Sequence, residues 1–428
     1  MAERSREAPS PAERRVAQVA WDALAGLAPA LDAPLAEILG GAAAERVLDR
    51  LLRRLGPLSR PARAAVAEAV FGVALWRRRL RAQLGLPDAP PRHLLGALLR
   101  DLGGRADWAA LAALAPAALP PAAPPPAALA DRWSLPDWLA EELVRAAGED
   151  APALAGALDQ PGPICLRVNP LRTTTDGLAG RLAEEGVTTA PGQLVPGSLV
   201  VAQAPGARPN VYGLGAFQEG LFEVQDEGSQ LLGLLVEARA GDAVLDACAG
   251  AGGKTLLLAA AVGPRGRVHA ADPDAERLER LRARAARAGA DAMIAVHGPV
   301  APQDLLVDRA LVDAPCSELG ALRRGPDVRW RLDPAAFAAL PALQLAILED
   351  AARRVRAGGR LVYATCTFRR EEDEAVAEAF ERAHPEWRRV RAAAAPAETV
   401  TPEGFVRTWP HRHGTDGFFA AVWERAAP

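Results

Sequence analysis

The strongest constraint on the fold is an alternation of strand-like and helical segments in the second half of the chain. Between residues 220 and 428, short apolar runs alternate with longer amphipathic runs. The apolar runs are DAVLDACAG, GRVHAAD, AMIAVHG, RALVDAP and GRLVYATC, and the amphipathic runs include DAERLERLRARAARAG and PAAFAALPALQLAILEDAARRVRAGG. This alternation predicts an α/β fold with a mostly parallel sheet and helices on both faces. Ligands of such sheets bind at the carboxyl ends of the strands, so functional residues are expected there.

The rest of the chain divides at a proline-rich stretch. RRVAQVAWDALAGL, AAAERVLDRLLRRL and RPARAAVAEAVFGVALWRRRLRAQL have helical periodicity and predict an all-α domain over residues 1–117. ALPPAAPPPAALA, residues 118–130, predicts a stiff linker because proline cannot continue a helix. LPDWLAEELVRAAG, PICLRVNPLR and TTDGLAGRLAEEGV predict helix, strand and helix, a small α+β subdomain over 131–215. The α/β domain then covers 216–428.

Composition narrows the class of protein. The chain has 428 residues, no uncharged apolar run long enough for a membrane span, and an N-terminus, MAERSREAPSPAERR, without the apolar core of a secretory signal. A cytoplasmic protein without membrane contact is therefore expected. The four cysteines are too few for a disulfide framework and have no zinc-ligand spacing, which predicts free thiols and no metal site. The net charge of −3 means that binding to nucleic acid needs a local basic patch.

A glycine-rich turn follows the first strand of the α/β domain, in the sequence LDACAGAGGKT over residues 245–255. Glycines allow the backbone to approach a ligand closely, and a helix N-terminus favours negative charge. A phosphate-binding P-loop needs glycine where Cys248 stands, and a dinucleotide fingerprint needs glycine where Thr255 stands. The remaining interpretation is a loop around the methionine part of S-adenosylmethionine. Lys254 is the single lysine among 50 basic residues, which indicates a sterically fixed role rather than a solvated surface position.

An acidic residue follows the second strand. Asp272 lies about twenty residues after the glycine turn, where a carboxylate can accept hydrogen bonds from both ribose hydroxyls of a nucleoside cofactor. The alternative is a helix N-cap, because Asp272 and Asp274 both precede a helical run. We assign the ribose to Asp272 and the cap to Asp274.

Two thiols follow neighbouring strands of the predicted sheet. The fourth strand ends in Asp313, with Cys316 three residues later, and the fifth strand leads directly into Cys366. Both thiols are therefore expected to face one crevice, and this convergence favours chemistry over the structural role of an isolated cysteine. Cys165 and Cys248 are interpreted as structural thiols.

At this point a family resemblance is evident. LDACAGAGGKT, DAPCSELGALRRGPDVRWR, GGRLVYATCTFRREEDE and PHRHGTDGFF resemble, in order and spacing, the motifs of the RsmB/Sun family of RNA cytosine-5 methyltransferases. The resemblance covers about residues 160–428 and includes FEVQDEGSQLL, which is similar to the entry helix of the catalytic domain. It implies a Rossmann-like class I methyltransferase domain. The N-terminal part is similar in size and pattern to a NusB-like RNA-binding domain.

The resemblance also implies a division of the chemistry. Carbon 5 of cytosine becomes nucleophilic only after a thiolate adds to carbon 6, and the family assigns this nucleophile to Cys366. Cys316 assists release of the enzyme, Asp313 binds the pyrimidine edge, and Lys254 orients Asp313 and brings positive charge to the catalytic centre. The residues expected to contact S-adenosylmethionine are Cys248, Ala249, Gly250, Ala251, Gly252, Gly253, Lys254, Asp272, Arg277 and Asp313.

The sequence departs from the family pattern in four places. Gly250-Ala251 replaces Ala-Pro in the glycine turn, and no acidic residue follows the third strand, where His297 and Gly298 stand instead. The usual carboxylate contact to the adenine amine is therefore not predicted. Glu318 replaces a glycine in the Pro-Cys-Ser-Gly turn, and Asp373 replaces an asparagine in a Glu-Asn-Glu run.

A basic loop follows the Pro-Cys motif. Trp330 is flanked in the sequence by Arg323, Arg324, Arg329 and Arg331. An arginine side chain can donate two hydrogen bonds to one phosphate and can stack on an unpaired base. The loop is predicted to contact RNA, with a merely solvated basic loop as the alternative.

Several functions therefore remain to be distinguished. The leading hypothesis is formation of 5-methylcytosine in small-subunit ribosomal RNA by a monomeric enzyme, with transfer RNA as the alternative substrate. A DNA cytosine-5 methyltransferase would use the Pro-Cys thiol as nucleophile and would not require Cys366. An inert RNA-binding factor would not require Cys316, Cys366, Asp313 and Lys254 together.

Overall fold

The structure, a computed structural model, describes residues 10–202, 209–325 and 327–427. Its described residues form two compact units, and each is treated by itself. The first takes in the chain up to Pro161 together with Leu322–Asp333, and the second takes in Gly162–Ala202, Pro209–Ala321 and the chain from Pro334 onward. A short segment of the catalytic half of the sequence thus belongs to the N-terminal unit.

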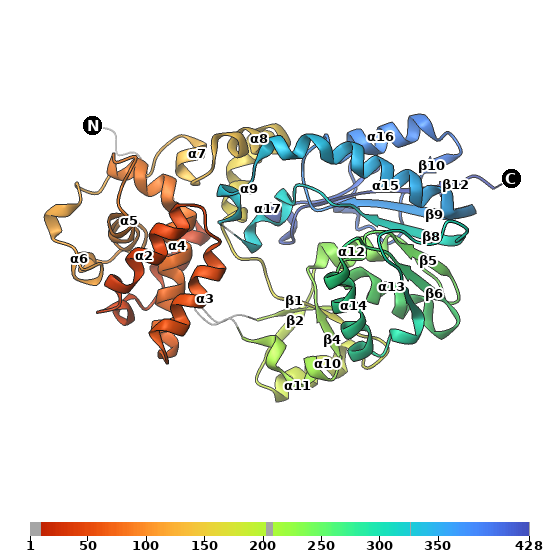
Figure 1. Cartoon of the computed structure of the whole chain (residues 1–428), viewed down its shortest axis with the longest axis horizontal. Coiled ribbons are helices and arrows are strands. Elements are labelled where there is room, and N and C mark those ends of the chain that lie inside the picture. Colours follow the sequence, from red (N-terminus) through yellow and green to blue (C-terminus); the bar gives the residue numbers. More distant parts are fainter. Residues whose placement is uncertain (1–9, 203–208, 326, 428) are drawn as a thin grey trace. The chain divides into compact units, whose positions relative to one another are not determined.

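The first unit is helical, as predicted. Its α-helices are α1 (Pro11–Ala17), α2 (Asp32–Leu39), α3 (Ala44–Leu55), α4 (Arg60–Leu84), α5 (Pro91–Ala97), α6 (Trp108–Leu111), α7 (Leu129–Arg132), α8 (Asp137–Ala147) and α9 (Ala151–Leu158). Helix α4 is the long central one in Figure 1; the Ser59 hydroxyl caps its N-terminus, and Gly85 ends it in the left-handed region at φ 64°. The periodic run RRVAQVAWDALAGL is not one helix, since α1 ends at Ala17 and a 3₁₀ turn follows at Trp21–Leu24.

The loop Leu322–Asp333 is grouped with this helical unit, and its residues Asp327 and Arg329 are buried there. Arg329 is completely buried, and its Nη1 lies 2.7 Å from Asp159 Oδ1. Asp327 Oδ2 accepts a 3.0 Å hydrogen bond from the backbone N–H of Ala44, the first residue of α3. The N-cap residue of α3, Ala43, has no side-chain acceptor, so Asp327 satisfies a helix N-terminus that is 283 residues away in sequence.

The second unit begins with a small antiparallel sheet. Its strand order is β2 (Thr189–Pro191), β3 (Ser198–Val201), β1 (Cys165–Val168) and β4 (Phe222–Val224). Helices α10 (Thr175–Glu184) and α11 (Gly215–Gln218) accompany it. Leu166, Leu178, Leu182 and Phe222 bury their side chains together in a separate small core. This confirms the predicted α+β fold of the subdomain, but the helix LPDWLAEELVRAAG that the sequence assigned to it is α8, which belongs to the first unit.

The large sheet confirms the predicted α/β fold. Its strand order is β10 (Trp387–Arg389), β12 (Phe418–Arg425), β9 (Val355–Thr365), β8 (Val307–Asp313), β5 (Ala243–Asp246), β6 (Arg267–Ala270) and β7 (Ile294–Val296), with β11 (Val406–Thr408) paired to β12. The five strands from β9 to β7 are parallel, and β10, β11 and β12 pair antiparallel. Each of the five apolar runs identified in the sequence forms one of the parallel strands.

Helices cover both faces of this sheet (Figure 1). They are α12 (Glu227–Leu234), α13 (Gly253–Val262) and α14 (Ala275–Ala288) on one face, and α15 (Leu340–Arg354) and α16 (Glu374–Ala383) on the other; the short α17 (Pro410–His413) precedes β12. Successive strand residues supply the two cores in turn: Val244 packs with the first set of helices and Leu245 with the second. Because both faces of these strands are buried, their sequences are continuous apolar runs rather than alternating apolar and polar residues.

The segment Pro334–Arg354 is apolar and long enough to cross a membrane by length and composition alone. Its helical part, α15, packs the buried Leu348, Ala351 and Ala352 into the core that β8 and β9 share. The buried Gln344 donates to the backbone carbonyl of Pro315 and to Glu372 Oε2. These contacts give α15 the role of a sheet-covering helix.

The burial of Arg329 leads to a stability prediction. Arg329→Ala leaves Asp159 in the core without its cation, and breaking a buried ion pair in this way should lower the free energy of unfolding by about 3 kcal/mol. Arg324→Ala, at an exposed position of the same loop, should change it by less than about 1 kcal/mol. Urea denaturation followed by circular dichroism measures both; equal small effects would contradict the structural role of Arg329.

Candidate active site

The two predicted thiols meet at the carboxyl ends of adjacent parallel strands. Cys316 follows β8 and Cys366 follows β9, and the Sγ atoms lie 3.3 Å apart. The backbone N–H of Cys366 also donates to Cys316 Sγ at 3.4 Å. Both side chains are partly exposed. The hydrogen bond to Cys366 and burial raise the pKa of Cys316 well above its ordinary value, so Cys316 keeps its proton at neutral pH and can donate it to Cys366.

The two turns that carry the thiols are hydrogen-bonded to each other along their length. The N–H of Ala314 donates to the carbonyl of Ala364, and the N–H of Gly320 donates to the carbonyl of Cys366. The hydroxyl oxygens of Ser317 and Thr367 lie 2.8 Å apart. These contacts continue the β8–β9 pairing beyond the strands and fix the distance between the sulfur atoms.

A pair of buried carboxylates supports these turns, and sequence reasoning missed it. Glu372 Oε2 accepts hydrogen bonds from the N–H of Ser317 and from Gln344 Nε2. Asp373 Oδ1 accepts from the hydroxyl of Thr365, and Asp373 Oδ2 lies 3.0 Å from Arg407 Nη2. Both acids follow the Thr-Cys motif closely in sequence, but only their complete burial distinguishes them from the neighbouring exposed Glu371.

An ion pair connects the glycine turn to the end of β8. Lys254 Nζ lies 2.6 Å from Asp313 Oδ2, and the lysine side chain is mostly buried whereas the aspartate is 29% exposed. This is the contact expected of a lysine that orients Asp313. Lys254 is the second residue of α13, directly after the glycine turn. A lysine ammonium is more compact than a guanidinium, which suits this confined position.

The glycine turn between β5 and α13 has the backbone that a close ligand requires. Gly250 and Gly252 have φ angles of 52° and 88°, in the left-handed region that favours glycine. A Cβ on Gly252 would lie 2.7 Å from Leu281 Cγ, whereas a Cβ on Gly250 would meet nothing within 4 Å. Gly252 is therefore needed for packing against α14, and Gly250 leaves open space on the turn.

Asp272 lies at the end of β6, as predicted. Its Oδ2 accepts from the N–H of Gly250 at 2.9 Å and its Oδ1 accepts from the N–H of Asp274. Each carboxylate oxygen keeps a lone pair, so ribose hydroxyls can still bind there. Asp274 is the N-cap of α14, as predicted, and accepts from the N–H of Arg277. The Arg277 side chain is 55% exposed and its Nε lies 3.4 Å from Asp274 Oδ2.

A buried carboxylate under the glycine turn tests the fit of S-adenosylmethionine. Asp246 ends β5, and burial raises its pKa to about 6 although the Thr255 hydroxyl donates to Oδ2. Its Oδ1 is buried and has no hydrogen-bond partner within the part of the chain that the structure describes. Such an oxygen needs a hydrogen-bond donor, and a positively charged donor would also stabilise the ionised carboxylate. The amino group of the methionine part of S-adenosylmethionine meets that requirement.

His297 follows β7, the third strand, at the place where the family has an acid, and it packs against His269 of β6. The rings of His269 and His297 stack with centroids 5.4 Å apart, and His269 Nδ1 lies 3.1 Å from His297 Nε2. Burial lowers the pKa of both imidazoles. The carbonyl of Gly298 accepts from the N–H of Asp272, so this turn is hydrogen-bonded to the residue that follows β6.

The remaining cysteines differ from the paired thiols. Cys165 lies in β1 and is buried. Burial raises the pKa of Cys248 well above its ordinary value, so it stays protonated in the glycine turn. Among the described residues, no group of three or more His, Cys, Asp or Glu side chains could hold a metal ion.

The basic loop requires a correction. Arg329 is buried against Asp159 and Arg323 is 7% exposed, so the prediction that both face RNA was wrong. The high proportion of arginine in the chain concealed this, because a buried and a solvated arginine give the same sequence pattern. Arg324 is exposed, and Arg331 is 36% exposed and paired with Asp327. The guanidinium of Arg77 lies over the Trp330 ring, with its Cζ 4.0 Å from the ring centroid.

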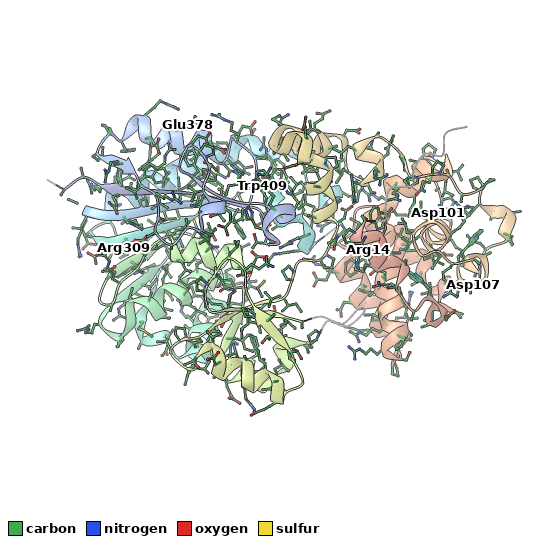
Figure 2. The ribbon with its side chains drawn as sticks, turned by 180° about the vertical axis from the view of Figure 1, so that it is seen from behind. Arg14, Asp101, Asp107, Arg309, Glu378 and Trp409 are labelled. Carbon is green, nitrogen blue, oxygen red and sulfur yellow. The ribbon has the colours of Figure 1, made fainter. Side chains whose placement is uncertain are left out.

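Aromatic side chains flank the Thr-Cys turn. Phe368, two residues after Cys366, stacks with Trp409 at a centroid distance of 6.3 Å, and Trp409 is labelled in Figure 2. Arg407, which holds Asp373, also lies over the Trp409 ring at 5.3 Å. The contacts that hold the turn after β9 therefore include a residue of β11, Arg407.

Comparison with known proteins gives a consistent family. The family described as 16S rRNA methyltransferase RsmB/F matches residues 233–424, and the ferredoxin-like domain of RsmF/B-like methyltransferases matches residues 135–207. The chain is 36% identical over 312 residues to a probable ribosomal RNA small subunit methyltransferase B of Synechocystis, covering 70% of this chain and 68% of that protein.

Further relatives agree. A Bacillus subtilis protein described as a probable ribosomal RNA small subunit methyltransferase B is 33% identical over 301 residues, covering 68% of this chain and 66% of its own length. The chain therefore spans about two thirds of the length of these relatives. The crystal structure of PH0851 has the same fold with a TM-score of 0.73, 23% identity and coverage of 98% of this chain and 100% of that one.

The strained turn beside Cys316 gives a first prediction. Glu318 has φ 57°, in the left-handed region that costs a residue with a Cβ roughly 1 kcal/mol. Glu318→Gly should therefore raise the free energy of unfolding by about 0.5–1 kcal/mol and leave methyl transfer intact. Thermal and urea unfolding measure the change; a loss of stability would show that Glu318 makes a compensating contact.

The buried acid behind the Thr-Cys motif gives a second prediction. Burial raises the pKa of Asp373 to about 8 from an ordinary value of 3.8, so the folded protein holds a proton that the unfolded chain releases. This contribution to stability is complete below about pH 4 and is lost as the pH rises through about 8. From pH 5 to 8, the wild type should lose at least about 1 kcal/mol more stability than Asp373→Asn.

The matched control is Asp176→Asn, because Asp176 is an exposed carboxylate on α10. Its stability curve should run parallel to that of the wild type. Urea denaturation across the pH range measures all three proteins, and parallel curves for wild type and Asp373→Asn would contradict the buried protonated acid.

Proposed function

The chain belongs to the RsmB/F family of 16S rRNA methyltransferases, and from this premise we propose that its two thiols divide the chemistry of cytosine-5 methylation, with Cys366 as nucleophile and Cys316 as the releasing group. The observation that carries the proposal is the 3.3 Å separation of their Sγ atoms at the ends of β8 and β9. Both can reach the same pyrimidine ring.

We assign the nucleophile from the family resemblance, which places it in the Thr-Cys motif, at Cys366. Cys316 is the more deeply held one: it accepts the N–H of Cys366, and its raised pKa keeps it protonated. A protonated thiol is a poor nucleophile because the thiolate is the reactive form. Cys366, directly after β9, would lose its proton to a base and add to carbon 6 of the cytosine as a thiolate.

Asp313 and Lys254 would hold the base during this addition. The Asp313 carboxyl, partly exposed at the end of β8, would accept from the exocyclic amine and stabilise a proton on ring nitrogen 3. Lys254 keeps that carboxyl in place through the 2.6 Å ion pair. As the Cys366 sulfur bonds to carbon 6, the electron pair of the 5,6 double bond becomes available at carbon 5.

Bound S-adenosylmethionine supplies the electrophilic methyl group that carbon 5 takes. The residues that would hold it are the turn from Cys248 to Gly253, Asp246, Asp272 and Arg277. A base, such as solvent water, must then take the carbon 5 proton; the bonding pair restores the double bond and the Cys366 sulfur leaves carbon 6 as a thiolate. Cys316, within hydrogen-bonding distance of Cys366, would assist this release.

The substrate follows from the family and from the helical unit. We propose small-subunit ribosomal RNA as the substrate, the NusB-like helical unit as an RNA-binding domain, and a cytoplasmic monomer as the working form. Arg324 and Arg331 remain as proposed RNA contacts of the basic loop. Transfer RNA is the competing substrate.

The thiol assignment is tested by trapping. Cys316→Ala should form the bond to carbon 6 but fail to break it, and should therefore accumulate a denaturant-resistant adduct with a transcript of small-subunit ribosomal RNA in the presence of S-adenosylmethionine. Cys366→Ala should form none. Denaturing gel electrophoresis with labelled RNA shows the adduct as a shifted band.

The matched control is Cys165→Ala, because Cys165 is a buried thiol in β1 away from the paired turns. It should behave as wild type. Adduct with Cys366→Ala and none with Cys316→Ala would reverse the roles. Bisulfite sequencing of ribosomal and transfer RNA from a deletion strain then identifies the substrate by the methylcytosine that is lost and restored with the wild-type gene.

A further inference from the structure

The helical unit contains a cavity of about 470 Å³ at the C-terminal end of α4. Arg77, Arg78 and Arg81 line it from α4, together with Asp131 of α7 and Trp330 of the basic loop. The remaining lining residues are small or apolar. All of these residues belong to the first compact unit, so the cavity is a feature of one folded body.

The three arginines differ in whether their charge is already used. Arg78 is held by two acids, with Nε 2.6 Å from Asp131 Oδ1 and Nη1 2.7 Å from Asp137 Oδ1. Arg77 and Arg81 form no ion pair with any acid in the described ranges. The Arg81 Nε is buried without an acceptor among those residues. The acid that lines the cavity is therefore committed to Arg78, and two cations remain available.

Trp330 adds a polar group to the same wall. Its ring is covered by the Arg77 guanidinium at 4.0 Å, which leaves the edge of the guanidinium free to donate hydrogen bonds. The indole Nε1–H is buried and has no acceptor in the part of the chain that the structure describes. A buried N–H donor without a partner is costly, so it indicates a missing acceptor.

The electrostatics of the cavity favour an anion. Burial, and secondly the neighbouring Arg81, lower the pKa of Arg77 to about 10, and Asp327 opposes this shift. Two guanidinium groups near each other gain from a bound anion that offsets their repulsion. Asp327 itself is occupied by Arg331 and by the N–H of Ala44.

We propose that this cavity binds a phosphodiester group of the RNA substrate, with Arg77 and Arg81 as the charged donors and Trp330 as an additional wall and donor. The inference rests on the proposed function, because the substrate is RNA. Trp330 lies fourteen residues after Cys316 in sequence, so a single short segment of chain joins the cavity to the Pro-Cys turn. The volume exceeds that of a phosphate ion and accommodates a nucleotide.

The test is the salt dependence of RNA binding. Each phosphate contact that is lost reduces the slope of log K against log salt by about 0.7–0.9. Full-length Arg81→Gln should bind a transcript of small-subunit ribosomal RNA about tenfold more weakly and with a slope smaller by this amount. Arg77→Gln should have the same effect, and Trp330→Phe, which keeps an aromatic ring and removes the donor, should weaken binding severalfold without changing the slope.

The matched control is Arg63→Gln, since Arg63 is an exposed arginine near the other end of the same helix. It should leave affinity and slope at the wild-type values. Circular dichroism checks that each variant is folded. With Arg81→Gln, KM for RNA should rise while kcat at saturating RNA stays unchanged.

Two outcomes overturn the proposal. An unchanged salt slope in both arginine variants excludes a phosphate contact here, and a change in Arg63→Gln as large as in Arg81→Gln shows only a general loss of charge. If the slope for RNA is unchanged while Arg81→Gln weakens the binding of inorganic phosphate, the cavity is assigned to free phosphate rather than RNA. Failure of the proposed function would be seen in a different experiment. In that case Cys316→Ala forms no adduct with RNA, whatever the salt dependence of RNA binding.

Discussion

The parallel pairing of β8 with β9 is the contact on which the active site depends. It places Cys316 and Cys366 at the same edge of the sheet, and the hydrogen bonds from Ala314 and Gly320 extend the pairing past the strands. A thiol pair at 3.3 Å requires both turns to be fixed, because a loop that shifts by 1 Å would separate the sulfurs or push them together. The pairing of strands in the sheet therefore fixes the relative positions of the two sulfur atoms.

The buried acids Glu372 and Asp373 complete that support at an energetic cost. Each holds a turn, one through the N–H of Ser317 and the other through the hydroxyl of Thr365. Burial raises the pKa of Asp373, which means that the fold tolerates an unfavourable environment for this carboxyl in exchange for a fixed hydrogen bond to Thr365, next to Cys366. Arg407 limits the cost from the other side.

The loop Leu322–Asp333 has a different structural role from the one that its sequence indicates. Four arginines around a tryptophan resemble a solvated RNA-binding loop, yet Arg329 serves as a core residue and Asp327 caps α3. The loop is therefore anchored in the helical unit while its ends continue into the catalytic unit. Trp330 instead lines a cavity together with arginines of α4.

The sequence by itself determined the α/β sheet, the helical N-terminal unit, the glycine turn, the Asp274 cap and the convergence of the two thiols, because periodicity, glycine positions and strand order are local or topological properties. Only the tertiary structure decided which polar side chains are buried. Glu372, Asp373, Asp246 and Arg329 lie inside, although Glu371, next to Glu372, and Arg324, in the same loop as Arg329, are exposed. Burial depends on which distant segment packs over a residue, and no local pattern in a chain this rich in arginine and acid encodes that.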